Sequence, residues 1–189
     1  GGYAERFQHD LRVRAAVSYI TGAHAFKVGM NAGNGDIDSL LFLSGNNNYY
    51  VRLNNVTPNL ITEFATPYHD GWNLDRELGM YAQDKWTLGR ATINGGIRLD
   101  TIKTSFPSET YGAQQFTPTR NFTLPETPNV DWKDVTPRLG VAYDVFGNGK
   151  TALKVSLNKY LIGVDSPAFS YGTQAPYNRI VHTTTRSWT

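Results

Sequence analysis

A Gly-Lys-Thr triplet at positions 149–151 is the first stretch of this sequence in which nucleotide chemistry is conceivable. Phosphate-binding loops have a glycine five positions before this triplet, so that backbone amides surround the phosphates, and a helix begins directly after it. Position 144 is aspartate instead, and its carboxylate would lie where phosphate oxygens belong. The sequence therefore favours a turn over a phosphate loop, provided that a strand follows Thr151.

Candidate metal ligands are scattered along the chain. Asn34, Asp36 and Asp38 have the spacing of the start of a calcium loop, but the glycine and the distal glutamate of such a loop are missing. The histidines lie far apart, and none forms a metal pair with another His, Asp or Glu at helical or strand spacing; they are His9, His24, His69 and His182. The sequence therefore predicts no metal and no other cofactor.

Catalytic residues are equally hard to find. Asp131 with Asp134, or Glu63 with Asp70, would be candidate carboxylate pairs, but nothing in the sequence fixes the separation that acid–base catalysis needs. No Gly-x-Ser-x-Gly segment provides a nucleophilic serine. We therefore expect a protein that is not an enzyme.

The composition favours strands and turns. The 189 residues include 18 basic and 16 acidic side chains, a balance that gives no reason to expect nucleic acid as a partner. Aromatic residues make up 13% of the chain and glycines number 18, a mixture typical of strands joined by turns. No apolar run approaches the roughly 18 to 20 residues of a spanning helix, which excludes a helical membrane protein but not a membrane β-barrel.

Two further features concern the compartment. The absence of cysteine fits an exported bacterial protein as well as many cytosolic ones. The first ten residues, GGYAERFQHD, lack the basic and apolar regions of a signal peptide. If the protein is exported, we expect this chain to be a processed or internal piece.

Alternation of apolar and polar residues predicts strands with two different faces. In ATINGGIRLD, residues 91–100, and in RLGVAYDV, residues 138–145, every second position is polar or small. Similar alternation marks RVRAAVSY and HAFKVGMN near the N-terminus, and ELGMYAQDKW belongs to the same series. The pattern indicates three hairpins with short turns at 21–23, 87–90 and 146–150.

The last of these strands is ambiguous by itself. Leu153, Leu157 and Leu161 would also line one side of a helix, but Val155 would then lie on the opposite side, which favours a strand. Glycine and asparagine in residues 146–150 supply the positive φ angles that a short hairpin turn requires. The Gly-Lys-Thr triplet is therefore most simply explained as part of this turn.

The lengths of the connections point to a class of fold. Short turns at one end of every hairpin and long connections at the other are typical of outer-membrane barrels, whose strands alternate apolar residues toward lipid with polar residues toward the lumen. The connections are rich in Asn, Gly, Asp and Pro, although YYVRLNN and NLITEFAT could form a local hairpin. The fold class that we predict is all-β, an antiparallel meander of long hairpins forming part of a transmembrane barrel.

Boundaries follow from the pattern. The predicted membrane strands are about 11–20, 24–32, 75–87, 91–101, 137–146 and 151–161, and the predicted extracellular loops are about 33–74, 102–136 and 162–189. Aromatic residues beside the short turns, with Tyr160 at the opposite end of its strand, suggest interfacial girdles. Asp84 and Lys159 have the parity of apolar neighbours, so we expect each at headgroup level or at a bulge.

Two longer segments also carry a resemblance to a known family. MYAQDKWTLGRATINGGIRLD (residues 80–100) and VDWKDVTPRLGVAYDVFGNGKTALKVSLNKY (residues 130–160) resemble barrel hairpins of TonB-dependent outer-membrane transporters. The closer likeness is to the Oar-like group, which carries a carboxypeptidase-regulatory-like domain ahead of the plug. NNVTPNLITEFATPY (residues 54–68) and TTTRSWT (residues 183–189) are similar to loop segments of that group.

The resemblance implies a barrel of about 22 strands around an N-terminal plug. It implies residence in the bacterial outer membrane, contact with its lipid, and import of a scarce extracellular ligand with energy relayed by TonB through the plug. Neither a plug nor a TonB-contacting segment is recognisable in this sequence, so we expect the chain to be a middle part of such a transporter.

Candidate site residues follow from this interpretation. Those expected to line the lumen are Arg12, Arg14, Lys27, Arg98, Arg138 and Lys154. Those expected to contact ligand from the loops, since aromatic faces and arginines suit sugars, peptides and anionic chelates, are Tyr49, Tyr50, Trp72, Tyr111, Trp132, Tyr171, Tyr177 and Arg179. The alternative is a secreted, soluble all-β binding or adhesion module, which would not require detergent.

Overall fold

The computed structural model describes residues 2–43, 48–161 and 175–188. The strands are β1 (Gly2–Thr21), β2 (His24–Leu43), β3 (Tyr49–Asn54), β4 (Thr57–Phe64), β5 (Tyr68–Leu88), β6 (Ala91–Phe106), β7 (Glu109–Tyr111), β8 (Phe122–Leu124), β9 (Thr127–Asp144), β10 (Ala152–Asn158) and β11 (Thr183–Ser187). A single 3₁₀ turn, η1, spans Pro176–Arg179 in this part of the chain. No helix among the described residues is long and apolar enough to cross a membrane.

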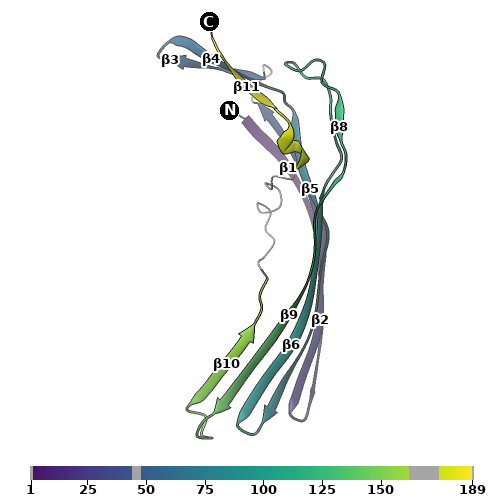
Figure 1. Cartoon of the computed structure of the whole chain (residues 1–189), viewed down its shortest axis with the longest axis vertical. Helices are drawn as coiled ribbons and strands as arrows, with labels where there is room; N and C mark the ends of the chain where they lie inside the picture. The colour runs from purple at the N-terminus through teal and green to yellow at the C-terminus, as the bar shows by residue number, and fades with distance from the viewer. Residues whose placement is uncertain (1, 44–47, 162–174, 189) are drawn as a thin grey trace.

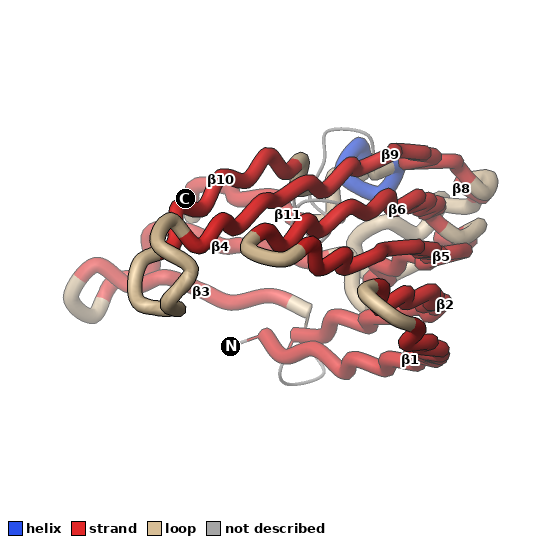
Figure 2. Tube along the Cα trace, turned by 90° about the horizontal axis from the view of Figure 1, so that it is seen from below, coloured by secondary structure: helices blue, strands red, loops and turns tan. Residues whose placement is uncertain are grey.

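Six long strands form one antiparallel sheet in the order β1-β2-β5-β6-β9-β10. Neighbours in the sheet are also neighbours among the long strands of the sequence, so the sheet is a meander without crossovers. The three short turns lie together at the bottom of Figure 1, and Figure 2 shows the strands in the same order across the sheet. The three predicted hairpins are confirmed, and the fold is all-β and antiparallel.

The turn at residues 146–150 is a hairpin turn and not a phosphate loop. Strand β10 follows it, with Val155 opposite Val141 of β9. The carboxylate of Asp144 accepts hydrogen bonds from the amides of Gly147 (3.0 Å) and Gly149 (2.8 Å). Both glycines have φ of +71°, a conformation that other residues rarely adopt. The carboxylate of Asp144 therefore already accepts the hydrogen bonds of the amides that a phosphate would need.

Strand pairing extends further than the composition suggests. Strand β2 continues to Leu43 and β5 begins at Tyr68, within a range that was expected to be irregular. Likewise, β6 continues to Phe106 and β9 begins at Thr127. The reason is that neighbouring long strands supply hydrogen-bond partners for the backbone of Gly, Asn and Asp. Register shifts near Asp75 accommodate the extra residue of β5 that has no partner opposite it. At the other end, β10 stops at Asn158, before the expected residue 161.

The long connections end in small sheets above the six-stranded sheet. The local hairpin that YYVRLNN and NLITEFAT could form is present as β3 and β4, and β11 adds to it in the order β11-β4-β3. Strands β7 and β8 form a second, two-stranded ribbon. These sheets lie at the top of Figure 1, opposite the short turns. We call this region the loop end.

The buried core lies at the loop end. Its cluster consists of Tyr68, Phe106, Tyr111, Ala175 and Tyr177, with Leu41, Trp72, Leu124 and Ile180 packed against it. The hydroxyl of Tyr68 donates to the carbonyl of Tyr177 (2.9 Å), which ties β5 to η1. Burial raises the pKa of Tyr68 to about 12, so this hydroxyl keeps its proton and remains a donor at neutral pH. The rest of the six-stranded sheet has no comparable core among the described residues.

Candidate functional site

One face of the six-stranded sheet is polar from edge to edge. Residues directly opposite each other in antiparallel strands share a face, so the register identifies the rows of side chains. One such row consists of Lys27, Gln83, Gly96, Arg138 and Asn158. The next contains Gly29, Tyr81, Arg98 and Thr136. We call this side the polar face.

All six basic residues expected to line a lumen lie on the polar face. Arg12 and Arg14 belong to it because Arg14 is opposite Asn31 of β2. Lys154 is opposite Ala142, which has the parity of Arg138 on β9. The register thus places Arg12, Arg14, Lys27, Arg98, Arg138 and Lys154 on one side of a single sheet.

The opposite face is apolar and uncovered. A typical row across five strands is Ala15, Met30, Met80, Leu99 and Val135. Met30 (40%), Met80 (44%) and Val135 (47%) are exposed although they lie in or near the middle of the sheet. A continuous apolar surface of this kind marks contact with lipid or with another protein. We call this side the apolar face.

Aromatic and charged residues mark the short-turn end of the apolar face. Trp86 stacks on His24 with ring centroids 5.2 Å apart. Asp84, which has apolar parity, lies with its Oδ2 2.6 Å from Nδ1 of His24. Asp84, a charged residue with the parity of the apolar face, therefore has His24 as a partner near the short-turn end of its strand. Beyond the end of β10, Tyr160 is exposed, and the guanidinium of Arg138 from the polar face lies 5.6 Å from its ring centroid.

Arg98 lies across the polar face. Its guanidinium donates to the carboxylate of Asp100 on its own strand (2.7 Å) and to the side-chain oxygen of Asn31 two strands away (2.7 Å). It crosses β5 at Gly79, where a β-carbon would collide with the arginine. Glycine at this position therefore lets the arginine reach across β5 and connect β6 to β2.

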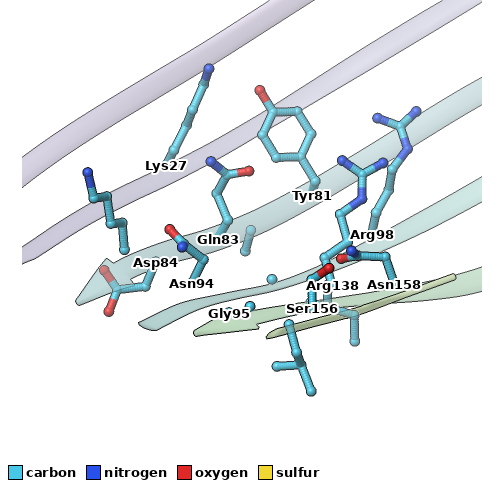
Figure 3. Close-up of a pocket in the computed structure, with 16 residues that line it drawn as sticks. Lys27, Tyr81, Gln83, Asp84, Asn94, Gly95, Arg98, Arg138, Ser156 and Asn158 are labelled. Atoms are coloured by element: carbon cyan, nitrogen blue, oxygen red, sulfur yellow. The ribbon is translucent and has the colours of Figure 1, made fainter. Parts of the chain in front are cut away.

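An open depression of about 510 Å³ lies on the polar face (Figure 3). Lys27, Tyr81, Gln83 and Arg98 project from the same side of the sheet, as Figure 3 shows. Arg138, Ser156 and Asn158 add polar groups to its lining from β9 and β10, and Ile97 and Leu139 are among its apolar lining residues. Ammonium, guanidinium, amide and hydroxyl groups of this kind hydrogen-bond water or a polar protein surface, and their arrangement is suited to a wet interior.

The candidate ligand residues expected in the loops divide into two sets, and two of them, Trp72 and Trp132, belong to β5 and β9 of the six-stranded sheet. Tyr111 and Tyr177 are buried in the core cluster, and Trp72 packs against it, so these rings contact protein. Tyr49, Tyr50 and Trp132 are exposed, as is Arg179 at the end of η1. Tyr171 lies outside the described residues. The accessible candidates are therefore Tyr49, Tyr50, Trp132 and Arg179.

One group of residues at the loop end has no counterpart in the sequence pattern. Asp38, His69 and Glu109 come from β2, β5 and β7, yet one potential ligand atom of each lies within 4.8 Å of the others. Asn34, Asp36 and Asp38 belong to strand β2, whose register with β5 shifts at Asn34, and they do not form a calcium loop. Spacing along the chain contains no signal for the three-strand group, because only the pairing of the strands creates it.

Comparison with known proteins gives one match. A family model described as TonB dependent receptor-like, beta-barrel, matches residues 3–182, which is nearly the whole chain. No curated protein and no solved structure matches the sequence.

Proposed function

Because this chain belongs to the TonB-dependent receptor family and is a segment of its outer-membrane β-barrel, we propose that it takes part in the import of a scarce ligand, with energy relayed by TonB. The TonB contact would be made through a plug domain outside this sequence. The family consists of transporters and not enzymes, and its members reside in the bacterial outer membrane. The barrel segment itself needs to supply no chemistry.

The observation that supports this proposal best is the segregation of the two sheet faces. A soluble sandwich would cover the apolar face with a second sheet, but the described residues leave it exposed along the six strands. Lipid is the partner that a transmembrane barrel offers to such a face, whereas a polar interior suits a lumen that holds water or a plug. The secreted-module alternative needs a cover for the apolar face, and residues 2–43, 48–161 and 175–188 provide none.

Roles for individual residues follow from this assignment. In the proposal, the lumen is lined by the six basic residues of the polar face and is filled by the plug. The loop end forms the extracellular vestibule, in which Tyr49, Tyr50 and Arg179, together with Trp132 on the adjoining part of β9, offer aromatic faces and a guanidinium to the ligand. Tyr111 and Tyr177 support this surface from the core beneath it.

A closer relationship to the Oar-like group is also part of the proposal. It is supported by the segments 80–100 and 130–160, whose residues resemble hairpins of that group. The sequence upstream of Gly1 in the complete gene product tests it. A plug preceded by a carboxypeptidase-regulatory-like domain is the expected finding, and a plug without that domain would contradict membership of the group.

Import is tested by comparing uptake in three strains. We expect cells that lack this protein and cells that lack TonB to fail to accumulate at least one common compound from a complex medium, measured by mass spectrometry of washed cells. A plasmid copy of the complete gene should restore accumulation only where TonB is present. Unchanged accumulation in the strain without this protein, for every compound that depends on TonB, would argue against the proposed import.

The orientation can be tested by labelling single cysteines, because the chain contains none. Val56 is 88% exposed in the turn between β3 and β4, so we expect Val56→Cys to react with a membrane-impermeant maleimide on whole cells. Lys150→Cys, in the short turn on the opposite side, should react only after the outer membrane is permeabilised. The unsubstituted protein provides the background. Equal labelling of both positions on intact cells would refute the assigned orientation.

A further inference from the structure

We propose that Asp38, His69 and Glu109 form a binding site for a divalent transition-metal ion such as Zn²⁺ at the loop end. Among the described residues, these three form the one group with three potential ligand atoms within 4.8 Å of one another. Each comes from a different strand, so a bound ion would join β2, β5 and β7. The site uses none of the residues that are proposed to contact the ligand, and it does not depend on the proposed import.

The backbone arrangement leaves room for the ion. Asp38 lies directly opposite Gly71 of β5, which has no side chain between the aspartate and its diagonal neighbour His69. Nδ1 of His69 is 3.4 Å from Oδ1 of Asp38. Both side chains are about half exposed, 40% for His69 and 51% for Asp38, so an ion from solution can reach them.

Charge gives the site its preference for a cation. The carboxylates of Asp38 and Glu109 point toward one imidazole, and no lysine or arginine of the described ranges pairs with either of them. One oxygen of each carboxylate lies within 4.8 Å of the other and of the imidazole nitrogen. The two negative charges therefore repel each other, and a divalent cation between them would relieve that repulsion.

The three ligands are held in place by buried neighbours. Each lies within two positions of a residue that is almost completely buried, namely Ser39 (2%), Tyr68 (4%) and Tyr111 (3%). Tyr111 also donates its hydroxyl to the carbonyl of His69 (2.8 Å), which fixes β7 against β5. Arg6 donates to the hydroxyl of Ser39 (3.0 Å) beside Asp38. The backbone of the site is therefore arranged before any ion binds, which lowers the cost of binding.

The donor atoms indicate the class of metal. One imidazole nitrogen with two carboxylate oxygens is a set that zinc and its neighbours accept, whereas calcium takes six to eight oxygens. Tetrahedral coordination at about 2.0 to 2.2 Å brings ligand atoms to about 3.4 Å from one another. Side-chain rotations would have to bring the ligand atoms from a present spacing of up to 4.8 Å to this distance, and a water molecule would complete the coordination.

Binding is tested with Zn²⁺ on the complete protein, purified in detergent without a histidine tag and stripped with a chelator. We expect calorimetric titration to detect a site that His69→Ala weakens by at least about tenfold, since loss of even an indirect partner of a ligand costs that much. His9→Ala is the matched control, because His9 also contacts an aspartate, Asp36 (3.1 Å), but without a third ligand. It should leave the affinity unchanged.

A second variant separates loss of binding from loss of folding. Glu109→Gln keeps the size of the side chain, so we expect the protein to remain folded and to lose Zn²⁺ affinity to a similar degree. In hydrogen exchange, Zn²⁺ should slow the amides of β7 and its connection to β8 in the unsubstituted protein and not in Glu109→Gln. Wild-type affinity in either His69→Ala or Glu109→Gln, or an equal loss in His9→Ala, would overturn the proposed site.

Discussion

Val141→Arg is expected to impair assembly of the complete barrel far more than Ala142→Arg, although the two positions are adjacent. Val141 lies opposite Ile93 and Val155 on the apolar face, near the middle of the predicted membrane part of β9. Ala142 lies opposite Thr92 and Lys154 on the polar face. Arginine on a lipid-exposed face near the bilayer midplane costs about 2 to 4 kcal/mol, whereas a lumen position offers water or polar partners.

A conservative change distinguishes lipid from a protein core. Val141→Leu should be nearly silent against fluid lipid, but in a closed core the added methylene would cost roughly 1 to 3 kcal/mol. The free energies of unfolding of all three variants, measured in detergent or liposomes, check both statements. If Ala142→Arg destabilises the barrel more than Val141→Arg does, the assignment of inside and outside is wrong. A strong destabilisation by Val141→Leu would contradict the contact of Val141 with lipid.

Phe106→Ala should open the loop end without unfolding the membrane strands. Phe106 is 1% exposed and meets Tyr177 edge to face, with ring centroids 5.7 Å apart. Truncation of a buried phenylalanine costs about 3 to 5 kcal/mol of stability. Here the truncation removes the contact between β6 and η1. We expect faster hydrogen exchange at residues 107–124 and 175–188, with exchange near the short turns unchanged.

Phe122→Ala is the control for this experiment. Phe122 stacks on Tyr111 at a centroid distance of 5.5 Å but is 39% exposed, so its truncation removes less buried surface. We expect a smaller acceleration, confined to β7 and β8. If both variants exchange like the unsubstituted protein, the cluster is not a cooperative core and the vestibule does not depend on it.

The residue pattern alone was sufficient for the local features of the fold. Alternation has a period of two, which is a property of each strand by itself, so the polar and apolar faces could be predicted before any pairing was known. The short turns were predictable for the same reason, because glycine and asparagine reveal their backbone requirements locally. Val155 was enough to favour a strand over a helix after the turn, and β10 confirms that prediction.

The tertiary structure decided what depends on pairing between distant segments. Composition suggested irregular loops at 33–43 and 127–136, but neighbouring strands provide hydrogen-bond partners there, and the ladders continue. Tyr111 and Tyr177 looked like ligand contacts because they lie in polar segments, yet the return of η1 toward β5 buries both. Asp38, His69 and Glu109 come together only through the register of β2 with β5 and the docking of β7. Local alternation determines which face a side chain occupies, but register and loop closure determine its neighbours, and those neighbours make the site.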